Sequence, residues 1–253
     1  MKTVTTFCFL FFISLKGYAY TILIDPGHGG EDEGATTKYY YSKKKWKVIK
    51  EKDLALSLAK KIHTQLKKRN FKSYLTRSVD RTVTLAERAD LAEKIKADLF
   101  ISVHINSSAG KKGRGFETYY LDNHNDSAIK KVEEIENKDL KGDALVVNKI
   151  LTDLVIERTV KSSKGLANSI HYQIQRLVSK KYKLRDRGVK PGLFYVLALT
   201  KRPAILLEVG FLSNSKDLKK ILNPSFQMRY AKAVAVGISN FIKSKKKTEP
   251  ALL

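Results

Sequence analysis

The sequence predicts a single-domain α/β fold, in which a mostly parallel, twisted sheet is flanked by helices on both faces. Short apolar runs of strand character alternate with segments whose apolar residues recur at helical spacing. Several of the runs are apolar throughout, which is typical of strands buried on both faces. The chain has 253 residues, which is enough for one such domain with a full core.

The first predicted strand covers residues 21–24 and ends at Asp25-Pro26-Gly27, a loop signal. A helix at about 52–69 follows, because Leu54, Leu58, Ile62 and Leu66 share one helical face. The later elements are a strand at 71–75, a helix at 85–95, strands at 99–103, 116–121, 193–197 and 204–207, and a closing helix through 226–241.

Both ends of the chain depart from a globular pattern. Residues 1–19 combine a basic start, the apolar run from Phe7 to Ile13 and the small residues Gly17 and Ala19, which is typical of a secretory signal peptide. An uncleaved N-terminal anchor is the alternative. We therefore expect a periplasmic or secreted protein with no transmembrane segment in the mature chain. Residues 20–243 are predicted to form the catalytic domain, and 244–253 a charged tail.

The net charge of +24 comes from 49 Lys+Arg against 25 Asp+Glu. Such a charge attracts polyanions. The lysines are dispersed along the chain, and we find no interleaving of aromatic and basic residues that would indicate a base-stacking surface. With the export signal, this pattern predicts a lysine-rich exterior and no nucleic-acid partner.

Two histidines follow predicted buried strands. His28 lies in Pro26-Gly27-His28-Gly29-Gly30, and His104 lies in Ser102-Val103-His104-Ile105-Asn106. In parallel sheets the carboxyl ends of the strands form ligand sites, so the two loops can converge. Taken alone, each histidine also fits an ordinary structural role. His63, His124 and His171 fit surface patterns and are left out of the site.

Two histidines and one acid would give a catalytic zinc ion three protein ligands and leave its fourth position open. Glu51, at the start of the first helix, is one candidate for the acid, although favourable charge at a helix N-terminus explains it equally well. Glu31, Asp32 and Glu33 compete because they lie near His28. Glu208 follows four apolar residues, so we expect it to be buried and free to act on water at the metal; a salt bridge to lysine is its alternative.

The sequence lacks the motifs of several other hydrolases. It contains no H-E-x-x-H zinc helix and no G-x-S-x-G nucleophile elbow. Matches to S-x-x-K, as at Ser57 to Lys60, are not followed by K-T-G. A serine mechanism is therefore disfavoured.

Six motifs in order resemble the zinc-dependent N-acetylmuramoyl-L-alanine amidase family of the cell-separation type, from about Thr21 to Ile242. They are Ile24 to Gly30, Glu51 to Leu56, Thr76 to Asp80, Leu85 with Arg88, Ser102 to Asn106 and Glu208 to Asn214.

The resemblance implies His28, Glu51 and His104 as ligands of Zn²⁺, Glu208 as the catalytic glutamate and peptidoglycan as the substrate. It also implies that residues 122–162 form a helical insertion that occludes the zinc until a protein activator displaces it, with Glu136 capping the metal. Asp25 and Asn106 are hypothesised to orient the histidines.

The implied reaction is hydrolysis of the amide between the lactyl group of N-acetylmuramic acid and L-alanine of the stem peptide. A zinc peptidase acting within the stem peptide is the nearest alternative. A non-catalytic wall-binding module with the same fold is another.

Overall fold

Six strands form the central sheet of the computed structural model, which describes residues 20–137 and 143–248. Their order is β4-β1-β5-β8-β6-β7, and only the β6–β8 pairing is antiparallel. This confirms the predicted fold class. The strands are β1 (Thr21–Pro26), β4 (Lys72–Leu75), β5 (Leu99–Asn106), β6 (Phe116–Leu121), β7 (Asp186–Gly192) and β8 (Ala204–Phe211).

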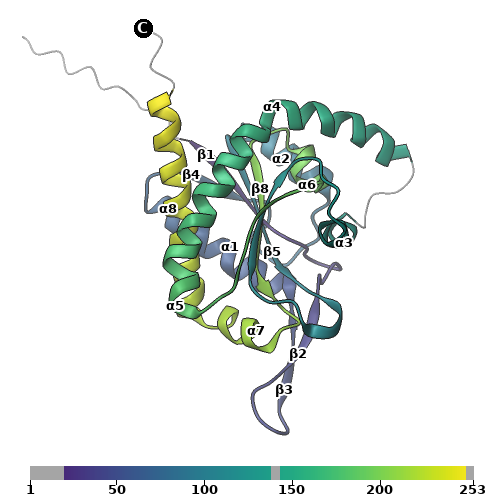
Figure 1. Cartoon of the computed structure of the whole chain (residues 1–253), viewed down its shortest axis with the longest axis vertical. Helices are drawn as coiled ribbons and strands as arrows, with labels where there is room; N and C mark the ends of the chain where they lie inside the picture. The colour runs from purple at the N-terminus through teal and green to yellow at the C-terminus, as the bar shows by residue number, and fades with distance from the viewer. Residues whose placement is uncertain (1–19, 138–142, 249–253) are drawn as a thin grey trace, which may run out of the picture.

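Helices cover both faces of the sheet (Figure 1). One face packs against α1 (Glu51–Lys67), α8 (Pro224–Thr248) and the later part of α4 (Asp143–Ile174), through an apolar cluster that includes Leu58, Ile170 and Val234. The other face packs against α2 (Leu85–Lys94) and α6 (Tyr195–Leu199). Val155 and Ile156 of α4 belong to this second cluster, so α4 contributes to both layers.

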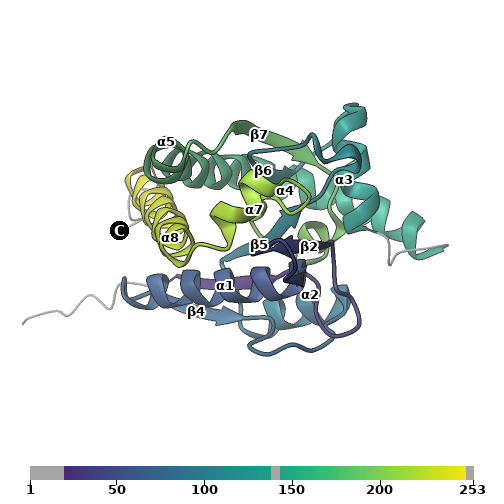
Figure 2. The same ribbon diagram turned by 90° about the horizontal axis from the view of Figure 1, so that it is seen from below.

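Smaller elements complete the fold, several of which are labelled in Figure 2. An antiparallel hairpin lies between β1 and α1. These elements are β2 (Thr36–Tyr40), β3 (Trp46–Lys50), η1 (Ala109–Lys111), α3 (Ser127–Glu136), η2 (Gln175–Ser179), α5 (Lys180–Tyr182) and α7 (Ser215–Ile221).

Most predicted elements are present, but the predicted strand at 193–197 is wrong. Residues 195–199 form α6, and the neighbouring strand is β7, at 186–192. β7 is an edge strand with two glycines and Pro191, so its residues lack the apolar run that marks the central strands. The β2–β3 hairpin also has no buried apolar run and was not predicted.

Two predicted segment boundaries fall inside continuous helices. In the region 122–162 the chain forms α3 and the first part of α4, and α4 continues without a break through residue 162. α8 extends to Thr248, beyond the predicted start of the tail at 244. The predicted signal peptide, 1–19, and the last five residues lie outside the described residues. None of the described helices is both long and apolar enough to span a bilayer.

Candidate metal centre

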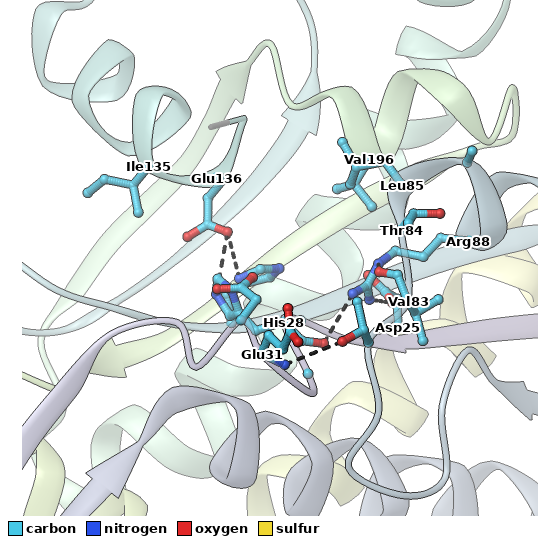
Figure 3. Close-up of a pocket in the computed structure, with 16 residues that line it drawn as sticks. Asp25, His28, Glu31, Val83, Thr84, Leu85, Arg88, Ile135, Glu136 and Val196 are labelled. Atoms are coloured by element: carbon cyan, nitrogen blue, oxygen red, sulfur yellow. Dashed lines mark hydrogen bonds and ion pairs between the residues drawn. The ribbon is translucent and has the colours of Figure 1, made fainter. Parts of the chain in front are cut away.

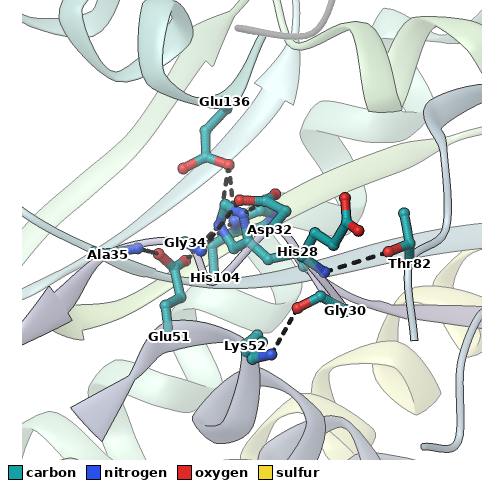
Figure 4. Close-up of polar contacts among 12 residues, drawn as sticks. His28, Gly30, Asp32, Gly34, Ala35, Glu51, Lys52, Thr82, His104 and Glu136 are labelled. Carbon is teal, nitrogen blue, oxygen red and sulfur yellow. Dashed lines mark hydrogen bonds and ion pairs between the residues drawn. The ribbon is translucent and has the colours of Figure 1, made fainter. Parts of the chain in front are cut away.

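Four side chains from distant parts of the chain meet at the carboxyl ends of β1 and β5 (Figure 4). His28 lies in the loop after β1, Glu51 is the first residue of α1, His104 lies on β5, and Glu136 is the last residue of α3. One potential ligand atom from each lies within 4.8 Å of all the others. The structure thus brings together the three residues that the family resemblance implies as ligands and Glu136, the residue that it implies as the cap.

The donor atoms of this cluster face a common point. Oε1 of Glu51 lies 3.2 Å from Nε2 of His28 and 3.3 Å from Nδ1 of His104. Oε2 of Glu136 lies 2.8 Å from the same His104 nitrogen. Both ring nitrogens are buried and neither completes a hydrogen bond of normal geometry. Buried polar atoms are rarely left without partners, and imidazole nitrogens and carboxylate oxygens are the ligands that zinc uses, so this donor set fits a divalent metal ion.

Asp32 orients the ring of His28. Its Oδ2 lies 2.7 Å from Nδ1 of His28, which leaves Nε2 directed at the cluster. Such a carboxylate–histidine contact fixes the tautomer of a metal-binding imidazole. His28 itself has a φ of 59°, which places its backbone in the left-handed region. Asp32, one of the acids near His28, therefore orients the imidazole of His28 and is not part of the cluster.

The carboxylate of Glu51 is fixed by two backbone amides. Ala35 N donates to Oε2 over 2.9 Å, and Ile105 N donates to Oε1 over 2.8 Å. Gly34 has a φ of 65°, and a side chain there would overlap both His28 and Glu51. The loop after β1 thus needs glycine at this position to let the imidazole and the carboxylate approach each other.

Charges within the cluster shift the pKa values of both histidines in the same direction. Burial lowers the pKa of His28, but the carboxylates of Glu51 and Asp32 outweigh it and raise the pKa to about 9. Burial also lowers the pKa of His104, but the carboxylates of Glu136 and Glu51 outweigh it and raise this pKa to about 10. The cluster therefore stabilises positive charge strongly, and a divalent cation can take the place of those protons.

Glu208 lies next to this centre on β8, directly opposite His104 in the β5–β8 register. Its side chain is fully buried, and neither carboxylate oxygen has a hydrogen-bond partner. Burial raises its pKa well above the usual value, and the neighbouring carboxylates of Glu136 and Glu51 add to the effect. A buried carboxyl group without a partner is costly, and groups of this kind cluster at functional sites.

Comparisons with known proteins agree on one family. A sequence profile of the N-acetylmuramoyl-L-alanine amidases matches residues 22–240. The chain belongs to this family. It is 28% identical to the amidase AmiA of Escherichia coli over 235 residues, covering 89% of this chain and 77% of AmiA. It is 32% identical to the probable amidase AmiB of Haemophilus influenzae, covering 98% of this chain and 59% of that one. An amidase structure from Clostridium difficile 630 superposes with a TM-score of 0.66 at 30% identity, covering 90% of this chain and 98% of that one.

The reaction of this amidase is therefore hydrolysis of the N-acetylmuramoyl-L-alanine amide of peptidoglycan. A pocket of about 480 Å³ adjoins the metal centre and can receive part of the substrate (Figure 3). His28, His104 and Glu136 lie on its polar side. Apolar side chains form other parts of its wall, and they are Val83, Leu85, Ile135 and Val196.

The hypothesis that Asp25 and Asn106 orient the histidines stays a prediction, and their side-chain hydrogen bonds run to other residues. Asp25 accepts hydrogen bonds from Thr76, Ser102 and Arg88, and Asn106 donates to Glu117. Burial raises the pKa of Asp25, but the Arg88 guanidinium, the Thr76 hydroxyl and His104 together outweigh it, so the net shift is downward. Asp25 and Arg88 form a buried ion pair. Arg88 also donates to the carbonyl oxygen of His28, so the ion pair lies under the loop that carries His28.

Arg77 braces the same loop from the other side. It is buried and donates to the carbonyl oxygens of Pro26, Gly27 and Lys52. These bonds join the end of β1 to the first turn of α1. In the sequence Arg77 stands out only as part of a family motif, because no local pattern shows that a basic residue will be buried.

Two of the histidines that were expected at the surface are largely buried in this amidase. His171 of α4 stacks on Phe116 with ring centroids 4.6 Å apart, and it contacts Thr118 and Asp186. His124, just before α3, places Nε2 2.6 Å from Oε1 of Glu133. For His171 the expectation failed because its partners on β6 and β7 are distant in the sequence. For His124 it failed because the start of α3 brings Glu133, nine positions later, back against the ring.

Proposed function

We propose that this amidase is an exported, zinc-dependent enzyme that releases stem peptides from peptidoglycan during cell-wall remodelling and cell separation. The observation that carries the metal assignment is the convergence of four donor atoms within 4.8 Å, two of them buried ring nitrogens without hydrogen bonds. The signal-peptide pattern in residues 1–19 supports export to the periplasm or the outside of the cell.

In this proposal His28, Glu51 and His104 hold the zinc ion. A zinc ion there would supply a Lewis acid that polarises the substrate carbonyl and makes water more acidic at neutral pH. Asp32 keeps Nε2 of His28 available for the metal, and the amides of Ala35 and Ile105 hold the Glu51 carboxylate in place.

Glu208 is proposed as the general base and then the general acid. Its carboxylate takes a proton from the water that attacks the lactyl carbonyl, and returns that proton to the L-alanine nitrogen as the amide bond breaks. Its position suits both transfers, because the β5–β8 register places it opposite His104 and none of its bonding capacity is used by the protein.

The test of the reaction is mass analysis of digested peptidoglycan. We expect free stem peptides that begin with L-alanine, together with glycan strands whose lactyl carboxyl groups are free. Products cleaved inside the stem peptide would show a zinc peptidase instead. Binding to sacculi without release of peptide would show a non-catalytic wall-binding module.

We also propose that the described conformation is a closed state of the enzyme. A catalytic zinc ion keeps one position for water or substrate, whereas four protein ligands are typical of a structural site. Glu136, with Oε2 2.8 Å from His104 and 3.8 Å from His28, stands where a fourth ligand would bind. Substrate would then reach the metal only after the end of α3 moves away.

Polar contacts fasten α3 over the site. Glu133 accepts hydrogen bonds from the backbone amide of Leu193 and is paired with His124. The side chain of Asn137 donates to the carbonyl oxygen of Leu193 over 2.7 Å and accepts from the amide of Tyr195 over 3.0 Å. These two residues flank Glu136 and hold it over the histidines. A protein activator would have to break these contacts. CwlD of Clostridioides difficile, 24% identical to this chain, has the same fold and was solved bound to the GerS lipoprotein, so the fold can bind a protein partner.

Replacing Asn137 with alanine should raise the basal activity by about fivefold or more. The variant loses two hydrogen bonds that favour the closed state, each of which contributes about 1 kcal/mol, so the open state becomes more populated. Release of stem peptide from purified sacculi, without any activator, measures the change. Glu134→Ala is the matched control, because Glu134 is an exposed residue on the same helix. Equal rates for Asn137→Ala and the wild type, with both proteins folded, would contradict the gating proposal.

A further inference from the structure

The β2–β3 hairpin carries an exposed apolar surface that the metal centre does not use. The described residues include ten large apolar side chains that are strongly exposed, and four of them belong to this hairpin. Isolated apolar residues at a surface are normal, but a contiguous group indicates an interaction site. The four are Tyr40 (60% exposed), Tyr41 (59%), Trp46 (47%) and Val48 (47%).

The register of the hairpin places most of this surface on one face. Tyr40 pairs with Trp46, and Lys38 pairs with Val48. Residues directly opposite each other in an antiparallel pair project from the same side, and alternate residues of a strand do so too. The Lys38 ammonium lies 4.5 Å from the centroid of the Trp46 ring. One side of the hairpin therefore carries aromatic and apolar side chains together with a cation. We call this side the hairpin face, and it consists of Lys38, Tyr40, Trp46 and Val48.

The hairpin is strongly cationic. Residues 36–50 contain six lysines and no acidic residue. Lys50 is paired with Glu33 at the base, and the turn contains Lys43, Lys44 and Lys45. Aromatic and basic residues are therefore interleaved here, contrary to the sequence-based expectation that the chain has no such interleaving. A partner for this segment must combine apolar ring surfaces with negative charge.

The base of the hairpin is built into the metal centre. β2 begins two residues after Gly34, and β3 ends at Lys50, directly before the ligand candidate Glu51. The amide of Glu51 donates to the carbonyl oxygen of Ala35 over 2.9 Å, which ties the two ends together. From Thr36 to Tyr40 the strand extends about 14 Å, and Figure 1 shows the hairpin projecting beyond the rest of the fold.

The hairpin face contributes little to the stability of the fold. Of the residues in β2 and β3, only Ile49 is fully buried in the core, with Tyr39 partly buried against it. The aromatic side chains on the opposite side therefore stay in water unless a ligand covers them. Exposing the three large apolar side chains of this face, Tyr40, Trp46 and Val48, is unfavourable for solubility, so a binding role explains them better than packing does.

We propose that the hairpin face binds the peptidoglycan polymer beyond the cleaved linkage, with Trp46 and Tyr40 stacked on sugar rings and the lysines paired with stem-peptide carboxylates. This inference rests on the proposed function. Peptidoglycan meets both chemical requirements, because its sugars have apolar faces and its stems carry free carboxylates. Peptidoglycan also fits the position of the hairpin, because a polymer seated at the metal centre passes the base of the hairpin. An anionic membrane would also supply negative charge, but binding to a membrane would not explain why the base of the hairpin is joined to the metal centre.

The test compares Tyr40→Ala/Trp46→Ala with a matched control, Tyr74→Ala, which removes a similarly exposed aromatic residue from the edge strand β4. Binding is measured by co-sedimentation with sacculi in a Glu208→Gln background, so that the polymer is not digested. We expect the double variant to bind at least about fivefold more weakly, because two aromatic contacts are lost. The control should bind like the parent protein.

Hydrolysis gives a second readout. The ratio of the rate on sacculi to the rate on a soluble fragment, with one N-acetylmuramic acid and its stem peptide, should fall in the double variant, since that fragment lacks the neighbouring sugars and stems of the polymer. Unchanged sacculus binding by a folded double variant overturns the proposal. The proposal is also overturned if the double variant binds sacculi normally and loses only its binding to vesicles of anionic phospholipid, because that result would assign the face to a membrane. Failure of the wild type to release any stem peptide would instead refute the proposed function.

Discussion

Glu208→Gln should reduce turnover by about a thousandfold while the protein keeps its metal. Glutamine has nearly the same size and shape but cannot accept the proton of the attacking water, and general acid–base catalysis contributes between about 10² and 10⁴ in rate. A thousandfold loss corresponds to about 4 kcal/mol of transition-state stabilisation. Stem-peptide release from sacculi measures the rate, and elemental analysis measures the metal.

The fold of this variant should be intact. Among the residues that the structure describes, Glu208 has no hydrogen-bond partner, and its carboxylate is fully buried, so a neutral amide replaces a group that is unfavourable to bury. We expect a thermal midpoint no lower than that of the wild type. Turnover within tenfold of the wild type would remove Glu208 from its proposed role as general base.

His104→Ala should lose both the metal and the activity. Two protein ligands would remain of the three proposed, and the carboxylates of Glu51 and Glu136 would face each other without the imidazole between them. We expect at least about a thousandfold loss of turnover, because neither the Lewis acid nor the polarised water would be available. His28→Ala should behave in the same way.

The control for these ligand variants is His63→Ala. His63 lies on α1, bonds to Ser73 and is outside the donor cluster. Because the His104 ring packs tightly on the backbone of Gly27, the alanine variant leaves a cavity. In His104→Gln the longer side chain fills more of that space. A folded His104→Gln protein that lacks metal would therefore show that the loss of metal does not come from a folding defect. Retention of metal and activity in both His104 variants would refute the ligand assignment.

The fold could be predicted where strands are buried on both faces. β1, β5 and β8 read as uninterrupted apolar runs, and α1 and α8 have clear helical periodicity. The prediction failed at the margins. β7 is an edge strand that contains Pro191, and the β2–β3 hairpin keeps only Ile49 in the core, so neither has the apolar pattern on which the prediction depends.

The candidate site was predictable in part for a similar reason. His28 and His104 stand at the ends of buried strands, so a shared sheet edge places them together. Glu51 could not be separated from Glu31, Asp32 and Glu33 by spacing, and only the family resemblance favoured it.

The contacts of Asp32, Arg77 and Glu136 depend on the three-dimensional closure of loops. Glu136 is 108 positions from His28 along the chain and yet lies 3.8 Å from its ring. No local sequence pattern encodes a contact at that separation.

The most direct test of the account is the metal content and activity of the purified amidase before chelation, after chelation and after zinc is added back. We expect one zinc ion per wild-type chain, loss of hydrolysis when the ion is removed, recovery at one equivalent of zinc, and no recovery in His104→Ala. Full hydrolysis by protein that contains no metal would contradict it.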